Sequence, residues 1–246
     1  EHPSSQVYVR NKERACAKAG IASQVHRLPD TVSEPELLAI VGALNADPRV
    51  HGILVQLPLP LHLSTRTILA AISPAKDVDA FHPVNMGHVT TGRPNLAPCT
   101  PKGVIRLLRD YDIPIRGAHA VVLGRSRVVG RPMSSLLLAA DATVTTCHRH
   151  TTDSAAYARR ADILVVAVGK PGLVRAEWVK PGAVVIDVGI TRLPSGKLGG
   201  DVAFDEVAPK TSFITPVPGG VGPMTIAMLL ENTCVIAQRS ASADVA

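Results

Sequence analysis

Tyr8 and Lys12 are the first residues in the chain whose types and spacing could do chemistry. They lie four positions apart in a segment, residues 8–20, that is predicted to be helical, so both side chains belong to one helix face. A tyrosine ring beside an ammonium group could hold a flat substrate, and the lysine could transfer a proton. The same spacing also fits an exposed lysine beside a half-buried tyrosine, and the pair alone leaves both alternatives open.

Two further polar sites follow. Gln56 lies near the end of residues 51–57, an apolar run that predicts a buried parallel strand, and open α/β sheets bind ligands at the carboxyl ends of their strands. Asp77 or Asp79 could accept a hydrogen bond from an amino-substituted heterocycle or could close an Asx turn. Both lie early in residues 73–98, a segment predicted to be one long loop.

A glycine-containing turn marks a nucleotide site. Residues 121–132 predict a strand, a phosphate-binding turn and a helix, with Ser126 in place of the second glycine of G-x-G-x-x-G. The next predicted strand, 143–147, runs into a basic segment where an NAD-specific domain usually has an acid. An acid would repel a 2′-phosphate, whereas Arg125 and Arg149 would attract one, so the pattern favours NADP over NAD. Two solvated surface arginines would give the same pattern.

The elements that must position these residues alternate between strand and helix, which predicts an α/β fold with a parallel sheet covered on both faces. Strands are predicted at 120–123, 143–147, 163–168, 184–188 and 213–215. Helices are predicted at 8–20, from a capping box at Ser33 to about 45, at 65–72 after Ser64, from Thr100 as a cap, at 133–140 and at 224–238. The predicted domains are 1–98 with 224–246, and 99–223.

Composition excludes several classes of protein. With 246 residues, 46% of them hydrophobic, the chain is long and apolar enough to bury a core. The net charge of +6 is scattered and only 3% of residues are aromatic, which disfavours a nucleic-acid partner. No run reaches the length of a membrane span, and the four cysteines form no C-x-x-C pair, so we expect a cytoplasmic protein without a metal site or disulfides.

Eight motifs occur in a fixed order along the chain. They are Y-V-R-N-K at 8–12, V-Q-L-P-L-P at 55–60, K-D-V-D at 76–79, P-C-T-P-K-G at 98–103, G-R-S-x-x-V-G-x-P at 124–132, I-D-V-G-I at 186–190, G-D-V at 200–202 and P-V-P-G-G-V-G-P-M-T at 216–225. This series closely resembles the bacterial form of the bifunctional methylenetetrahydrofolate dehydrogenase/cyclohydrolase family.

The resemblance implies two α/β domains with a cleft between them, the second Rossmann-like, and a homodimer joined through the cofactor domains. It implies NADP-dependent oxidation of 5,10-methylenetetrahydrofolate and hydrolysis of the methenyl product to 10-formyltetrahydrofolate, on a folate with or without a polyglutamate tail. Lys12 matches the family's catalytic lysine, Gln56 the glutamine that supports it, and Asp79 the aspartate that holds the pterin.

The resemblance also implies the remaining site residues. Substrate-binding candidates are Ser5, Tyr8, Gln56, Asp79 and the backbone of Pro218, Gly219, Gly220 and Val221. Cofactor-binding candidates are Thr100, Gly124, Arg125, Ser126, Val129, Gly130, His148, Arg149, Val168, Gly169 and Ile190.

The chain departs from the family pattern twice. Ala80 stands where the family usually has glycine, which could tighten the turn that aims Asp79. An initial helix and strand of the family have no counterpart, so we expect the sequence to be a fragment. Two other functions remain open at this point: a dehydrogenase without the hydrolase step, and an NADP-binding regulatory module.

Overall fold

The computed structural model describes the backbone of residues 3–243 and the side chains of residues 8–242. The chain forms two compact units: residues 1–87 with 226–246 (unit 1), and residues 88–225 (unit 2). Residues 88–98, which the sequence pattern groups with the first domain, belong to unit 2. Each unit contains its own buried hydrophobic clusters.

Unit 2 is a five-stranded parallel sheet with the strand order β2-β1-β3-β4-β7. Its elements are α5 (Cys99–Asp110), β1 (His119–Leu123), α6 (Gly130–Ala139), β2 (Thr143–Cys147), α7 (Ser154–Ala158), β3 (Ile163–Val166), η1 (Ala176–Trp178), β4 (Val184–Asp187), β5 (Thr191–Arg192), β6 (Leu198–Gly199), α8 (Phe204–Val207), η2 (Ala208–Lys210) and β7 (Phe213–Ile214). All five predicted strands are present, with ends that differ by at most two residues. The β5–β6 hairpin is an addition that the sequence pattern missed.

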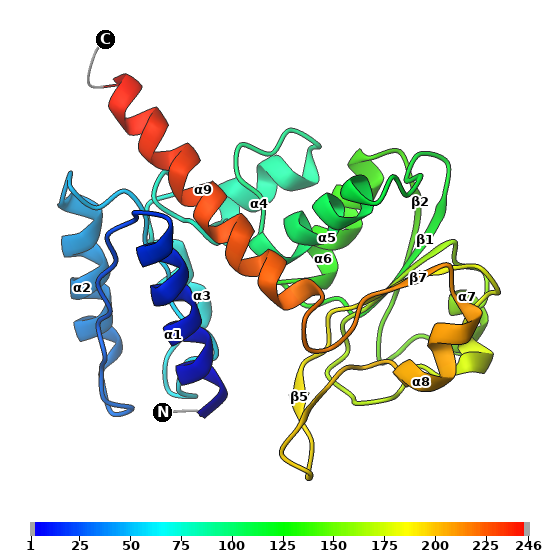
Figure 1. Cartoon of the computed structure of the whole chain (residues 1–246). Helices are drawn as coiled ribbons and strands as arrows, with labels where there is room; N and C mark the ends of the chain where they lie inside the picture. The colour runs from blue at the N-terminus through cyan, green and yellow to red at the C-terminus, as the bar shows by residue number, and fades with distance from the viewer. Residues whose placement is uncertain (1–2, 244–246) are drawn as a thin grey trace. The chain divides into compact units, whose positions relative to one another are not determined.

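Alternating side chains of β1 divide the core of unit 2 into two layers. Ala120 and Val122 pack with residues of α5 and α6 on one face, and Val121 and Leu123 pack with residues of α7 and α8 on the other (Figure 1). All four are at most 2% exposed. Strands that are buried on both faces read as continuous apolar runs, which is why this sheet could be predicted from the sequence.

Unit 1 is mainly helical. It contains α1 (Pro3–Lys18), α2 (Glu34–Ala46), α3 (Thr65–Ala71), most of α4 (Pro83–Thr90) and most of α9 (Val221–Ala243). The predicted strand at 51–57 is wrong as a strand. A parallel strand needs a neighbouring ladder, and within the described residues only a single bridge forms, between Ile53 and Asp77, with the Ile53 N–H donating to the Lys76 carbonyl at 2.7 Å.

The predicted loop at 73–98 is also wrong, because α4 lies inside it. Helix α4 begins with Pro83, and the Val84 N–H donates to Nδ1 of His82 at 3.1 Å. Histidine is not among the usual N-cap residues, so the start of this helix carries no common sequence signal. The predicted cap at Thr100 is displaced as well: α5 begins at Cys99, and Thr100 lies in its first turn.

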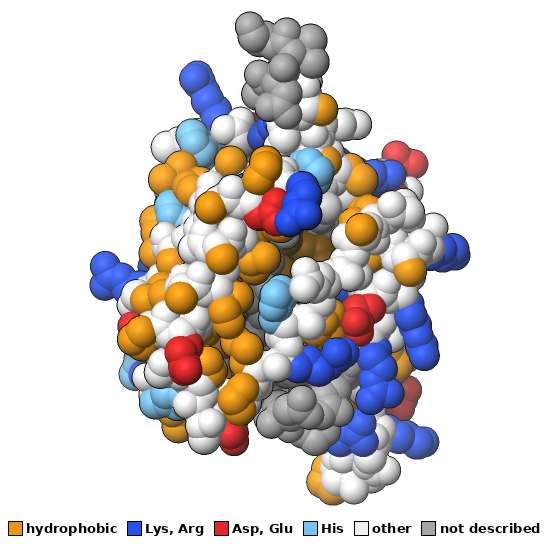
Figure 2. Space-filling model, turned by 90° about the vertical axis from the view of Figure 1, so that its left-hand side faces the viewer, with side chains coloured by type: hydrophobic (Ala, Val, Ile, Leu, Met, Phe, Trp, Pro, Cys, Tyr) orange, Lys and Arg blue, Asp and Glu red, His pale blue; other side chains and the backbone are white. Residues whose placement is uncertain are grey.

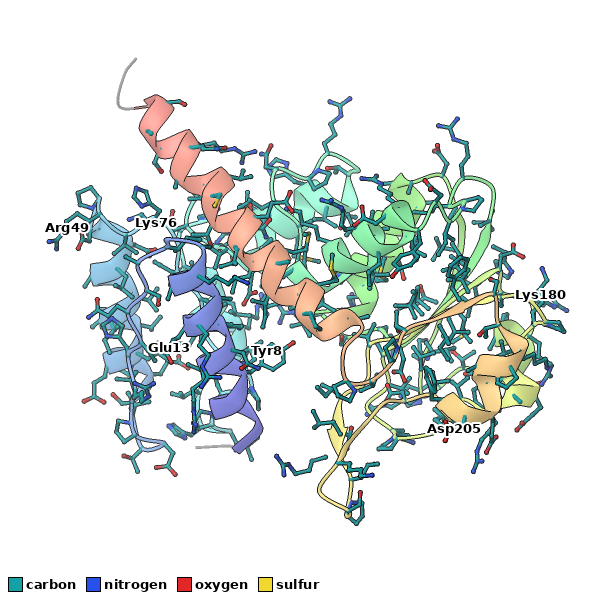
Figure 3. All side chains as sticks on the ribbon, in the orientation of Figure 1. Tyr8, Glu13, Arg49, Lys76, Lys180 and Asp205 are labelled. Carbon is teal, nitrogen blue, oxygen red and sulfur yellow. The ribbon has the colours of Figure 1, made fainter. Side chains whose placement is uncertain are left out.

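Helix α2 is fixed at both ends. Ser33 and Glu36 form the predicted capping box: the Ser33 hydroxyl accepts from the Glu36 N–H, and the Glu36 carboxylate accepts from the Ser33 N–H. At the other end, Lys76 donates through Nζ to the carbonyls of Leu44, Asn45 and Asp47 at 2.7–3.1 Å (Figure 3). The lysine of the K-D-V-D motif therefore stabilises a helix C-terminus.

Ser33→Ala should lower the free energy of unfolding by about 1 kcal/mol, because it removes the acceptor for one helix N–H and half of the capping box. Urea unfolding followed by circular dichroism measures the change. Ser242→Ala is the matched control, since that hydroxyl only donates to the Gln238 carbonyl within α9. Equal stability of the Ser33 variant and the wild type would contradict a contribution of this cap.

The surface is mixed in character. Figure 2 shows many hydrophobic side chains on the left of the face that it presents and most of the Lys and Arg side chains on the right. Across the described residues, no helix is both long and apolar enough to cross a membrane.

Candidate active site

The side chains of Lys12, Gln56 and Tyr8 meet in unit 1. Lys12 Nζ donates to Gln56 Oε1 at 3.0 Å, and the same Nζ lies 5.5 Å from the centre of the Tyr8 ring. Gln56 Nε2 donates to the Leu57 carbonyl at 2.8 Å, which fixes the amide so that its oxygen faces the lysine. Tyr8 and Lys12 both belong to α1, and Tyr8 is labelled there in Figure 3. All three side chains are partly exposed, so a ligand can reach the ammonium group.

The two aspartates of K-D-V-D have different roles. Asp77 is 1% exposed, and its Oδ2 accepts from the His82 N–H at 2.7 Å and from Asn85 Nδ2 at 3.0 Å. These bonds tie Asp77 to the start of α4, so it is committed to the fold. Asp79 is partly exposed and stays the candidate for ligand binding.

The turn that carries Asp79 is held on both sides. Asn232 of α9 is fully buried and donates through Nδ2 to the Val78 carbonyl at 2.8 Å. After Asp79, Ala80 has a φ of +57°, in the left-handed region that favours glycine. Ala80 is fully buried, and its N–H donates to the Asp77 carbonyl. Alanine at this position therefore adopts a backbone conformation that glycine would adopt more easily.

The predicted cofactor residues of unit 2 gather at one edge of the sheet. Gly124 follows β1, His148 follows β2, Val168 and Gly169 follow β3, and Ile190 follows β4. In a parallel sheet these positions lie at the carboxyl edge, where nucleotide ligands bind. Ile190 is 51% exposed, which leaves an apolar side chain open to solvent at this edge.

The glycine turn has no room for larger residues. A Cβ on Gly124, where φ is +116°, would lie 2.2 Å from the Ala167 carbonyl oxygen, and one on Gly130 would lie 2.1 Å from the Gly124 oxygen. Ser126, which replaces the second glycine of the motif, has a structural role in this turn. Its hydroxyl oxygen accepts from the N–H groups of Val129 and Gly130 at 3.1 and 3.3 Å. The serine holds the turn closed at the start of α6, and its hydroxyl proton can be donated to a phosphate.

The segment directly after β2, residues 148–152, is basic and contains no acid. Arg149 donates through Nε to His150 Nε2 at 2.9 Å, and neither Arg149 nor Arg125 pairs with a carboxylate among the described residues. The first acid in the chain after β2, Asp153, caps α7 by accepting from the Ala156 N–H at 3.0 Å. Two exposed guanidinium groups with no competing carboxylate suit a phosphate.

The remaining predicted site residues are Thr100, residues 218–221 and Ser5. The Thr100 hydroxyl lies 3.0 Å from that of Thr225, within unit 2. Pro218 follows a cis peptide bond, Gly219 has a φ of +108°, and the Gly220 N–H donates to the Pro216 carbonyl at 3.0 Å. Val221 is 5% exposed and packs in the core of unit 2, so it can offer a ligand only its backbone. The side chain of Ser5 lies outside the described residues.

Two buried aspartates were missed as individual site residues, although I-D-V-G-I and G-D-V are among the motifs. Asp187 ends β4 and is 3% exposed; its carboxylate accepts from the N–H groups of Gly189, Asp201 and Val202 at 2.9–3.0 Å. Burial raises the pKa of Asp187 to about 6, against the lowering effect of these three donors. The signal that could have found them is a glycine within two residues of the acid in both motifs, since glycine admits close backbone approach.

The raised pKa of Asp187 makes the stability of unit 2 depend on pH. A carboxyl group whose pKa is higher in the folded state takes up a proton on folding, so its contribution is largest below the unfolded pKa of about 4 and is lost as the pH rises through about 6. Between pH 5 and pH 7 this amounts to about 1 kcal/mol. Urea unfolding of wild type and Asp187→Asn at both pH values measures this: the free energy of unfolding should fall more between pH 5 and pH 7 in the wild type than in the variant. An equal change in both proteins would contradict the raised pKa of Asp187.

Two family models of known proteins match this chain. The family model of the tetrahydrofolate dehydrogenase/cyclohydrolase catalytic domain matches residues 1–79, and that of the family's NAD(P)-binding domain matches residues 98–241. The chain belongs to the tetrahydrofolate dehydrogenase/cyclohydrolase family. It is therefore a methylenetetrahydrofolate dehydrogenase and a methenyltetrahydrofolate cyclohydrolase with an NAD(P)-binding domain, and the resemblance in the sequence is confirmed.

Individual relatives cover nearly the whole chain. The bifunctional protein FolD of Acidiphilium cryptum is 60% identical over 96% of this chain and 85% of its own length. The crystal structure of the bifunctional enzyme FolD from Campylobacter jejuni has a TM-score of 0.94 at 52% identity, covering 97% of this chain and 85% of that one. The Trypanosoma brucei enzyme, complexed with NADP and an inhibitor, has a TM-score of 0.94 at 44% identity, covering 98% and 84%.

Proposed function

We propose that this member of the tetrahydrofolate dehydrogenase/cyclohydrolase family hydrolyses the methenyl group at Lys12 and oxidises the methylene group with NADP held at the carboxyl edge of unit 2. The observation that carries the first half is the 3.0 Å bond between Lys12 Nζ and the oriented amide of Gln56. The second half is supported by the absence of a carboxylate partner for Arg125 and Arg149 among the described residues.

Hydrolysis forms a bond from a water oxygen to the methenyl carbon and then breaks the bond from that carbon to N5. It needs a group that takes a proton from the water, and N5 must gain a proton as it leaves. Lys12 carries the amine that can exchange a proton with this water. Gln56 accepts one N–H of Lys12 and so directs the amine, while the Tyr8 ring provides a flat surface for the pterin. Asp79 is assigned to bind the pterin by accepting a hydrogen bond from the amino group of the pterin.

Oxidation makes smaller demands on acid–base groups, because the adjacent nitrogen lone pair stabilises the cation as hydride leaves. Bound NADP would supply the acceptor for this hydride. The protein contributes orientation: the glycine turn closed by Ser126 offers its backbone to the phosphates, and Arg149 and Arg125 offer guanidinium donors to a 2′-phosphate. NADP is also the cofactor in the Trypanosoma brucei relative.

The partner assignments are a folate substrate, with or without a polyglutamate tail, and a second copy of the chain in a homodimer. Gel filtration with light scattering tests the dimer.

A paired spectrophotometric assay tests the activities. With 5,10-methylenetetrahydrofolate and NADP, we expect NADPH to form without accumulation of the methenyl product, after subtraction of non-enzymatic hydrolysis. The same assay with NAD should be slower at equal concentration. Methenyl product that accumulates in step with NADPH would identify a dehydrogenase without the hydrolase step, and NADP binding without turnover would identify a regulatory module.

A further inference from the structure

Asp201 combines complete burial with an incomplete set of hydrogen bonds. Its side chain is 0% exposed, and Oδ2 accepts from the N–H groups of Val168 and Gly169 at 2.7 and 2.8 Å. Oδ1 has no hydrogen-bond partner within the described part of the chain. A buried carboxylate oxygen without a hydrogen-bond partner lowers the stability of the fold, so packing alone does not account for an aspartate at this position.

The contacts of Asp201 reach three segments at the carboxyl edge of the sheet. Its side chain binds residues 168–169 after β3, and a Cβ on Gly189, after β4, would lie 2.3 Å from the Asp201 Cγ. Its own N–H donates to Asp187 Oδ1 at 3.0 Å. Asp201 is therefore fixed by Asp187 and in turn fixes the turn after β3.

That turn also contacts the glycine turn. The Ala167 carbonyl oxygen faces Gly124 so closely that any Cβ there would lie 2.2 Å from it, and the Ala167 N–H donates to the Leu123 carbonyl at 2.8 Å. A shift of residues 167–169 would therefore move the backbone that forms the phosphate-binding turn. Interiors this closely packed transmit small displacements to their neighbours.

We propose that Asp201 is a positioning residue for the cofactor. It touches no reacting atom; it directs the N–H groups of Val168 and Gly169 inward and thereby sets the shape of the edge against which NADP binds. This inference rests on the proposed function, because Val168, Gly169 and Gly124 are cofactor contacts only by that assignment.

The test compares Asp201→Ala and Asp201→Asn with the wild type. NADP affinity is measured by calorimetry, dehydrogenase turnover with NADP, and cyclohydrolase turnover on methenyltetrahydrofolate without cofactor. In the alanine variant we expect NADP affinity to fall about 10- to 100-fold while cyclohydrolase turnover stays at the wild-type level. In the asparagine variant affinity should be close to wild type, because the amide oxygen can accept from both N–H groups.

Asp162→Ala is the matched control. Its carboxylate accepts from a backbone N–H, that of His119, at 2.9 Å, but before β3 at the amino edge of the same sheet. We expect this variant to lose stability in urea without losing NADP affinity. If Asp201→Ala does not fold, Asp201→Ser, which retains one acceptor, replaces it in the same comparison and should show the same split.

Three outcomes would overturn the inference. They are wild-type NADP affinity in the alanine or serine variant, an equal loss of affinity in Asp162→Ala, and an equal loss in a folded Asp201→Asn. Failure of the wild-type chain itself to bind NADP would instead refute the proposed function, so the two failures can be told apart.

Discussion

Lys12→Met should lower cyclohydrolase turnover by about 10²- to 10⁴-fold, the contribution of a positioned acid–base group. Methionine retains the length and the apolar stem of lysine but cannot take a proton from water or donate to Gln56 Oε1. Dehydrogenase turnover should fall less, because hydride transfer depends mainly on positioning. The measurement is initial rates of both reactions on the same preparation, with methenyltetrahydrofolate as the substrate of the first.

Lys18→Met is the control for this prediction. Lys18 lies in the last turn of the same helix, α1, and is exposed, so its replacement should leave both rates unchanged. Equal losses of the two activities in Lys12→Met, with stability and folate binding intact, would contradict the division of labour proposed for the lysine.

Arg149→Ala should weaken NADP binding by about 10- to 100-fold and leave NAD binding nearly unchanged. Hydrogen bonds between a guanidinium and a phosphate are charge-assisted, and bonds to charged groups contribute about 1.5–3 kcal/mol each. Only NADP carries the 2′-phosphate, so the loss should be confined to it. Parallel titrations of the two cofactors give the ratio directly, and the effect should shrink as salt is added.

Arg116→Ala is the matched control for Arg149→Ala. Arg116 is also exposed, but it precedes β1 at the amino edge of the sheet, where it pairs with Asp141 at 3.0 Å. Its replacement should change the affinity for neither cofactor. An equal loss of NADP and NAD affinity in Arg149→Ala would exclude Arg149 from the 2′-phosphate site and leave Arg125 as the candidate.

The sequence by itself determined the features that local signals specify. The strands of unit 2 could be predicted because strands buried on both faces appear as short apolar runs between turns. The capping box at Ser33 and the glycine-containing turn after β1 could be predicted because each is complete within a few residues, whereas the hydrogen bonds of the Ser126 hydroxyl were visible only in the structure. The ordered motifs along the chain determined the family.

Only the tertiary structure decided which polar groups meet. Gln56 lies 44 residues from Lys12 in the chain, and spacing alone could not show that its amide oxygen faces the lysine. Spacing and residue type do not separate Asp77 from Asp79, and only the family resemblance pointed to Asp79. In the structure Asp77 is buried and bonded to the start of α4, whereas Asp79 is partly exposed.

Dependence on distant parts of the chain also explains the wrongly predicted strand and the two aspartates that were missed. Residues 51–57 have the composition of a strand, but strand pairing depends on a neighbouring segment, and only Ile53 forms a bridge. The network around Asp187 and Asp201 joins residues from 168 to 202, and its donors are backbone N–H groups that any sequence contains. Beyond the nearby glycines, side-chain types do not show which backbone N–H groups a distant carboxylate binds, so only the folded chain reveals these hydrogen bonds.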